Sequence, residues 1–122
     1  MPTVLIVDDN EQHLKLARDV LQQAGFRTLE ARSGASGISL ALGHLPDLVL
    51  LDLRLPDLDG TDVLRRLRAD ARSAQLPVVA LSATPLEPGD DWFLAVGFDG
   101  YLPKPIDADA LPDQVRGFCA RP

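Results

Sequence analysis

The chain has 122 residues, 46% of them hydrophobic and 25% charged, which predicts one globular domain over residues 1–122 and excludes intrinsic disorder. Its formal charge of −6 opposes binding to a nucleic-acid backbone, and the single cysteine, Cys119, excludes an internal disulfide or a cysteine-rich zinc site. Because the sequence shows no export signal and no apolar stretch of about 18 residues, we expect a cytoplasmic protein without membrane contact.

Short apolar runs alternate along the chain with longer segments of helical periodicity. Apolar runs predict strands at residues 4–7, 48–51 and 78–81. A second, more polar strand is expected at residues 27–31, at an edge of the sheet, and a fifth at residues 98–102. Recurrence of apolar residues every three or four positions predicts five helices, marked by Leu14 to Ala24, Ala35 to Leu45, Val63 to Ala71, residues 90–96, and Leu111 to Phe118. Near-continuous apolar strands that alternate with helices indicate an α/β fold with a mostly parallel sheet covered on both faces.

Polar side chains stand at the C-terminal ends of four predicted strands. They are Asp8 and Asp9, Asp52, Ser82, and Lys104. The C-terminal ends of parallel strands share one edge of the sheet, where such folds bind ligands, so we expect these groups to converge. Three carboxylates in one place need a compensating cation, which Lys104 supplies only in part. Oxygen ligands with positions open to water favour Mg²⁺.

The segments that carry these residues are similar to the receiver domain of two-component response regulators. The similarity lies in residues 4–10, 50–60, 80–83 and 97–105, in receiver-like order and separation. The resemblance implies a flavodoxin-like, doubly wound (βα)5 fold with five parallel strands in the order 2-1-3-4-5. It also implies a signalling switch that catalyses only its own phosphoryl transfer and dephosphorylation, rather than an enzyme.

The resemblance also assigns roles in phosphorylation. Asp52 would accept a phosphoryl group from a phosphohistidine on a histidine kinase or histidine phosphotransfer protein. Asp9, Asp52 and the backbone carbonyl of Arg54 would bind Mg²⁺ directly, and Asp8 would act through a coordinated water. Arg54 and Thr84 occupy positions that tune the lifetime of the phosphoryl group, which leaves that lifetime open.

A conformational switch follows from the same resemblance. Ser82 and Lys104 would each bind a phosphoryl oxygen, and the Ser82 hydroxyl would move toward the phosphoryl group while Tyr101 turned inward. The face made by the fourth helix (90–96), the fifth strand (98–102) and the last helix would then change its contacts with a downstream protein. Lys104 and Pro105 would be joined by a cis peptide. Dimer formation on activation, the kinase and the target are left open.

Two alternative functions come from other features of the sequence. A phosphorylation-independent interaction module would keep the same fold, although the complete set of acidic residues argues against it. A small phosphatase would use Asp57 and Asp59, because residues 57–61 spell the DxDGT motif that opens haloacid-dehalogenase-type phosphatases. In that family the first aspartate follows the strand directly, whereas here the strand has already ended at Asp52.

The remaining histidines and aromatic residues give weaker expectations. Neither His13 nor His44 has a metal-ligand partner three or four residues away, so we expect both to face solvent. Trp92 and Phe93 are adjacent on a short helix and cannot easily both be buried. We expect one of them to pack on the sheet and the other to be exposed, and we expect Cys119 to pack as a small hydrophobic residue.

Overall fold

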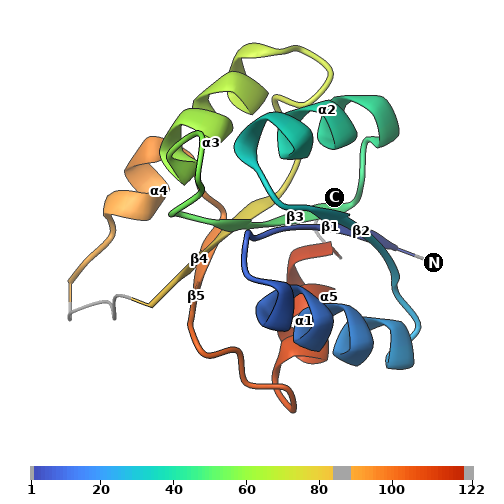
Figure 1. The fold of residues 1–122 in the computed structure, drawn as a ribbon. Coiled ribbons are helices and arrows are strands. Elements are labelled where there is room, and N and C mark those ends of the chain that lie inside the picture. Colours follow the sequence, from blue (N-terminus) through green and yellow to red (C-terminus); the bar gives the residue numbers. More distant parts are fainter. Residues whose placement is uncertain (1, 84–88, 120–122) are drawn as a thin grey trace.

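The computed structural model describes residues 2–83 and 89–119, which form a five-stranded parallel sheet between helices (Figure 1). The elements follow in the order β1 (Thr3–Val7), α1 (Glu11–Gln23), β2 (Arg27–Ala31), α2 (Gly34–His44), β3 (Leu48–Asp52), α3 (Gly60–Ala69), β4 (Val78–Ser82), α4 (Trp92–Val96), β5 (Gly100–Pro103) and α5 (Leu111–Cys119). The strand order is β2-β1-β3-β4-β5, and every neighbouring pair is parallel. The predicted α/β fold and strand order are therefore confirmed.

The strand side chains point alternately to the two faces of the sheet, which divides the hydrophobic core into two layers. One layer joins residues such as Ile6 and Leu50 to α1 and α5, below the sheet in Figure 1. The other joins Leu5 and Leu51 to α2, α3 and Phe98 above it. Because the side chains of a strand point alternately to opposite faces, a strand buried on both faces must be apolar at every position. This explains the unbroken apolar runs.

Helix boundaries differ from the sequence prediction at two places. Leu45, predicted to lie in the buried face of α2, is the residue after the helix, with a φ of 45° and 51% of its surface exposed. Pro46 follows it, and a residue before proline is disfavoured in the right-handed helical region. Ala71, predicted for the third helix, lies beyond its end and is exposed. There the Asp70 side chain accepts the backbone N–H of Arg72, an alternative to continuing the helix.

The region of α4 and β5 also differs from the prediction, because β5 begins at Gly100 rather than at residue 98. The fourth helix covers only Trp92–Val96 and ends at Gly97, whose φ is 112°. Phe98 is buried but precedes β5, because its backbone N–H donates to the carbonyl of Phe93 and so closes the end of α4. Phe93 packs on the core while Trp92 is 39% exposed, as expected for this pair.

Three smaller features complete the fold: a cis peptide bond, the packing of Cys119, and the length and apolar character of the helices. The Lys104–Pro105 peptide is cis, as predicted. Cys119 is partly buried and packs against the core layer between the sheet and helices α1 and α5. Among the helices of residues 2–83 and 89–119, none combines the length and apolar character needed to cross a membrane.

Candidate functional site

The register of the sheet brings the predicted polar residues to one edge. Val7 pairs with Leu51, Asp52 with Leu81, and Ser82 with Pro103, so the C-terminal ends of β1, β3, β4 and β5 lie side by side. A pocket at this edge is lined by residues at all four strand ends and by one residue of α1: Asp8, Asp9, Asn10, His13, Asp52, Arg54, Ser82, Ala83 and Lys104. The expected convergence of the strand-end residues is thus present.

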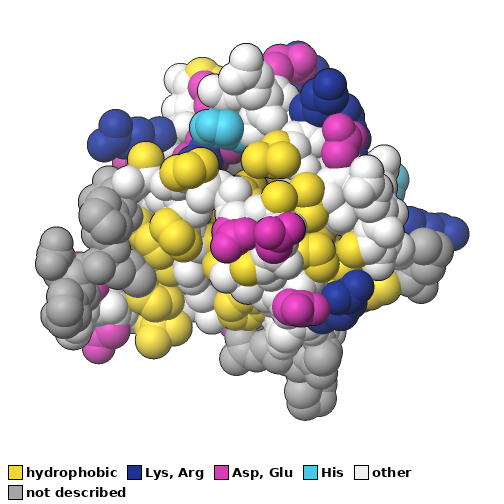
Figure 2. Space-filling model, turned by 90° about the horizontal axis from the view of Figure 1, so that it is seen from below, with side chains coloured by type: hydrophobic (Ala, Val, Ile, Leu, Met, Phe, Trp, Pro, Cys, Tyr) yellow, Lys and Arg dark blue, Asp and Glu magenta, His cyan; other side chains and the backbone are white. Residues whose placement is uncertain are grey.

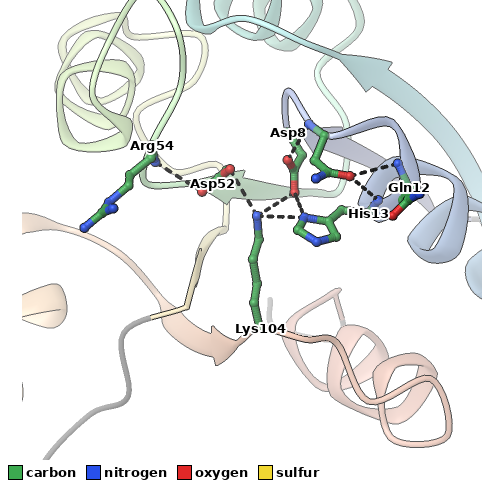
Figure 3. Close-up of polar contacts among 7 residues, drawn as sticks. Asp8, Gln12, His13, Asp52, Arg54 and Lys104 are labelled. Carbon is green, nitrogen blue, oxygen red and sulfur yellow. Dashed lines mark hydrogen bonds and ion pairs between the residues drawn. The ribbon is translucent and has the colours of Figure 1, made fainter.

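Lys104 joins the two buried carboxylates of this pocket. Its Nζ lies 2.7 Å from Oδ2 of Asp8 and 3.0 Å from Oδ2 of Asp52, as Figure 3 shows. The side chains are 11%, 1% and 10% exposed respectively, so both ion pairs are largely shielded from water. One ammonium held between two carboxylates offsets part of their repulsion.

Each buried carboxylate is also held by a nearby backbone N–H. Asp8 Oδ1 accepts the N–H of Asn10 at 2.9 Å, and Asp52 Oδ1 accepts the N–H of Arg54 at 3.1 Å. Asn10 lies in the loop that follows β1, and Arg54 lies in the loop that follows β3. The local backbone therefore orients both side chains. The carboxylates are therefore fixed at both oxygens.

Asp9 completes a cluster of three carboxylates. One oxygen each from Asp8, Asp9 and Asp52 lies within 4.8 Å of the other two, and the Asp9 side chain is exposed. Three carboxylates against the single ammonium of Lys104 leave an excess of negative charge. Hard oxygen donors with open positions fit Mg²⁺ better than a softer metal.

Burial and charge shift the pKa values of the central pair. Burial raises the pKa of Asp52, and the charge of Asp8 adds to this, against the hydrogen bonds from Arg54 and Lys104. For Lys104, burial lowers the pKa, but the hydrogen bonds and charges of Asp8 and Asp52 outweigh it, so that the pKa is raised. Because burial disfavours the ionised form of Asp52, a cation bound beside this carboxylate would stabilise that form.

Comparison with known proteins identifies the family. Residues 4–116 match the family model of the response regulator receiver domain. The chain belongs to this family. It is a receiver domain of two-component signalling, as the motifs around Asp8, Asp52, Ser82 and Lys104 implied.

Relatives of known name and structure agree with this assignment. The polar-differentiation response regulator DivK of Brucella ovis is 33% identical over 116 residues, which cover 95% of this chain and 94% of the relative. The receiver domain of a sensor histidine kinase from Pseudomonas aeruginosa is 29% identical, with a TM-score of 0.88 and 98% of both chains covered. That structure holds a magnesium ion coordinated in its active-site cleft. A receiver domain of a Francisella response regulator is 28% identical, with a TM-score of 0.88, covering 98% of this chain and 97% of that one.

The other predicted residues of the receiver site have mixed placements. Ser82 is partly exposed and lines the pocket. The Arg54 backbone reaches the site, but its exposed side chain extends away from Lys104 in Figure 3. Tyr101 is half-buried on β5, with its ring centroid 5.7 Å from that of Phe93. Thr84 lies outside the described residues.

His13 faces solvent only in part, with 38% of its side chain exposed, and the prediction missed its place at the site. Its Nδ1 lies 3.3 Å from Nζ of Lys104 and 3.4 Å from Oδ2 of Asp8, so the imidazole lines the pocket of the receiver site. Metal-ligand spacing was an uninformative signal for this residue. A better signal is its place in the first turn of a helix that starts just after the acidic pair. The second histidine, His44, is exposed as expected.

The DxDGT segment has a structural role in this receiver domain. Oδ1 of Asp57 accepts the N–H of Gly34 at 2.7 Å, and Oδ2 accepts the N–H of Ala35 at 3.0 Å. These bonds from Ala35 and Gly34 lower the pKa of Asp57. Asp57 therefore binds the N-terminus of α2 and lies outside the acidic pocket, an arrangement that accounts for the residue without phosphatase chemistry.

Proposed function

We propose that this receiver domain accepts a phosphoryl group on Asp52. The observation that carries the proposal is the Asp52 carboxylate, which ends β3 inside the pocket with one oxygen beside the Lys104 ammonium. An oxygen of Asp52 would form the new P–O bond while the P–N bond of a phosphohistidine breaks, and the bonding pair would return to the imidazole nitrogen of the donor. The product is an acyl phosphate.

Mg²⁺ is the cofactor that the chemistry of this pocket supports. We assign direct ligation to Asp9, Asp52 and the backbone carbonyl of Arg54, and contact through a water molecule to Asp8. The all-oxygen donor set and the proximity of the three carboxylates support this assignment. When bound, the ion would supply positive charge that offsets the negative charge of the phosphoryl oxygens.

Lys104 and Ser82 would bind the remaining phosphoryl oxygens. Lys104 already lies against Asp52, so a small movement of its flexible side chain brings the ammonium to a phosphoryl oxygen. Ser82 ends the neighbouring strand β4 and lines the same pocket. Positioning and charge neutralisation are the main needs of phosphoryl transfer, and these two groups serve both.

The switch would connect Ser82 to the surface of α4, β5 and α5. We propose that the Ser82 hydroxyl moves toward the phosphoryl group and that Tyr101 turns inward. Tyr101 lies in an aromatic cluster, with its ring centroid 6.2 Å from that of Trp92. Trp92, Leu94 and Val96 of α4 are 39%, 55% and 49% exposed, a concentration of apolar surface that suits a downstream protein target.

The proposed partners are proteins that carry or receive the signal. The phosphoryl donor would be a histidine kinase or a histidine phosphotransfer protein. Figure 2 shows that hydrophobic and acidic side chains lie beside one another on the face that carries α1 and α5, where Leu16 is 39% exposed. Such a mixed surface suits contact with protein.

The remaining proposals concern the extent of the domain, its reactions and its cellular location. We propose one receiver domain over residues 1–122, whose only reactions are its own phosphorylation and dephosphorylation. A cytoplasmic location is in keeping with the unpaired Cys119.

Intact mass spectrometry tests the proposed function. The protein would be incubated with acetyl phosphate, with and without Mg²⁺, beside Asp52→Ala and Asp57→Asn. We expect one phosphoryl group on the wild type and on Asp57→Asn, and none without Mg²⁺ or in Asp52→Ala. A phosphoryl gain that survives in Asp52→Ala would contradict the assignment. A gain lost in Asp57→Asn but kept in Asp52→Ala would favour the phosphatase alternative.

A further inference from the structure

His13 is placed at the receiver site by the start of α1. The Oδ1 of Asn10 accepts the backbone N–H groups of Gln12 at 2.9 Å and His13 at 3.2 Å, which caps the helix. The backbone N–H of Asn10 in turn donates to Asp8. This chain of bonds fixes the first turn of α1 relative to the acidic pocket, and the His13 ring points toward Lys104 in Figure 3.

The ammonium of Lys104 has three polar neighbours, the same number as its hydrogens. An ammonium has three hydrogens and no lone pair, so it can only donate. Its neighbours are Oδ2 of Asp8 at 2.7 Å, Oδ2 of Asp52 at 3.0 Å and Nδ1 of His13 at 3.3 Å. Nδ1 also lies 3.4 Å from Oδ2 of Asp8. It accepts from Lys104 in the imidazole tautomer that carries its N–H on Nε2, and the proposal takes this tautomer.

We propose that His13 is a positioning residue that aims Lys104 at the phosphoryl group. The inference rests on the proposed phosphorylation of Asp52. Of the three acceptors, Asp52 alone changes in the reaction, because its carboxylate becomes an acyl phosphate. Asp8 and His13 stay in place and hold two hydrogens of the ammonium. The third hydrogen then points to the side of Asp52, where the phosphoryl oxygen arrives.

The chemistry of imidazole suits this role. Lys104 carries its charge on a flexible four-carbon stem, and a single fixed partner would leave the ammonium free to turn about that bond. A second carboxylate would stop the rotation but would repel the incoming phosphoryl group. An uncharged ring nitrogen in the Nε2–H tautomer can orient the ammonium without that repulsion. Lys104 donates a hydrogen bond throughout and transfers no proton, so the phosphoryl step itself is unchanged.

Phosphorylation rates of His13 variants test the proposal. His13→Ala and His13→Leu remove the acceptor, the second with a side chain of comparable bulk, whereas His13→Asn places an amide oxygen close to the position of Nδ1. With acetyl phosphate and saturating Mg²⁺, we expect the Ala and Leu variants to gain the phosphoryl group about five to ten times more slowly, the effect of one lost hydrogen bond. His13→Asn should stay within about twofold of the wild type, a change below that of a lost hydrogen bond.

Two controls separate positioning from a general structural effect. His44→Ala changes an exposed histidine at the end of α2 and should leave the rate unchanged. The Mg²⁺ affinity of every His13 variant should equal that of the wild type, because His13 is not among the grouped carboxylates. Wild-type rates in His13→Ala and His13→Leu would overturn the proposal, and so would a His13→Asn variant as slow as His13→Ala.

A second experiment needs no phosphoryl donor. In a double-mutant cycle, His13→Leu and Lys104→Met are made singly and together, and unfolding by urea is measured without Mg²⁺. We expect non-additivity of at least about twofold in the unfolding constant, as for residues in contact. Additive effects would overturn the proposal. A wild-type protein that takes no phosphoryl group would instead contradict the function of Asp52, and the cycle would still decide whether His13 anchors Lys104.

Discussion

The Asp52 carboxylate is held in an unfavourable ionisation state by its surroundings. Burial raises its pKa in the folded protein, so ionisation at neutral pH costs folding free energy. Asp52→Asn removes this charge, while the amide oxygen can still accept a hydrogen bond from Lys104. We expect the variant to be more stable than the wild type by about 1 kcal/mol at pH 7 in urea unfolding.

The pH dependence of this gain follows from the direction of the pKa shift. The penalty for ionised Asp52 is fully present above its folded pKa, and it disappears as the pH falls toward the unfolded value of about 3.9. The advantage of Asp52→Asn should therefore shrink as the solution is acidified. Asp109→Asn removes an equal charge from an exposed site and should show no such gain. A loss of stability at pH 7 in Asp52→Asn would contradict the prediction.

The loop between β3 and α3 shows how an element fixes the site. Gly60 begins α3, and a Cβ added to it would lie 2.7 Å from the backbone oxygen of Asp52 and 2.8 Å from Cα of Leu53. Both contacts are with backbone, so a larger residue must displace the end of β3 that carries Asp52. We expect Gly60→Ala to lower the free energy of unfolding by about 1 to 3 kcal/mol and to weaken Mg²⁺ binding.

Another glycine provides the matched control. Gly43 lies near the end of α2, and no atom is found within 4 Å of a Cβ added there. Gly43→Ala should be neutral or slightly stabilising, because alanine is the better helix former. Urea unfolding and Mg²⁺ titration of both variants measure the difference. Equal behaviour of Gly60→Ala and Gly43→Ala would show that the close approach at Gly60 is unimportant.

Asp57 connects the same loop to a second element. Its carboxylate accepts the N–H groups of Gly34 and Ala35, which would otherwise lack partners within α2. We expect Asp57→Ala to lower the thermal midpoint while leaving phosphorylation of Asp52 intact.

The lowered pKa of Asp57 sets the pH range of this effect. The stabilisation is present above the unfolded pKa of about 3.9 and is lost as the pH falls through the lower folded value. The difference between Asp57→Ala and the wild type in thermal melts should therefore vanish at strongly acidic pH. Abolished phosphorylation in a folded Asp57→Ala protein would contradict a purely structural role.

The fold of the whole molecule was largely predictable from its pattern of apolar residues. Strands buried on both faces require unbroken apolar runs, so residues 48–51 and 78–81 identified β3 and β4 directly. The ends of the helices were less predictable, because local backbone conformation and side-chain hydrogen bonds determine where a helix stops. The left-handed Leu45 ahead of Pro46 and the side-chain bond of Asp70 both end helices within an apolar periodicity that continues past them.

The site was predictable to the extent that it depends on strand ends. Asp8 and Lys104 each follow a strand and Asp52 ends one, and parallel pairing in register brings them together. His13 does not follow a strand. The position of its side chain depends on the orientation of the first turn of α1, which the Asn10 cap fixes. Residue spacing alone does not specify this orientation. Sequence patterns thus located the groups held by the sheet and missed the group held by a helix.

Metal binding should couple the acidic site to the stability of the whole domain. The chain carries a formal charge of −6, and three of its carboxylates share one pocket with a single lysine. A cation bound only by the folded state stabilises it, by about 1.4 kcal/mol when the ion is present at ten times its dissociation constant. We therefore expect Mg²⁺ to raise the thermal midpoint of the wild type. In Asp9→Ala, which loses an exposed carboxylate of the proposed site without leaving a buried charge unpaired, the rise should be much smaller. NaCl at matched ionic strength separates this effect from general screening of the negative charge. If NaCl gave the same rise, or if Asp9→Ala responded to Mg²⁺ as the wild type does, the carboxylates would not form a specific metal site.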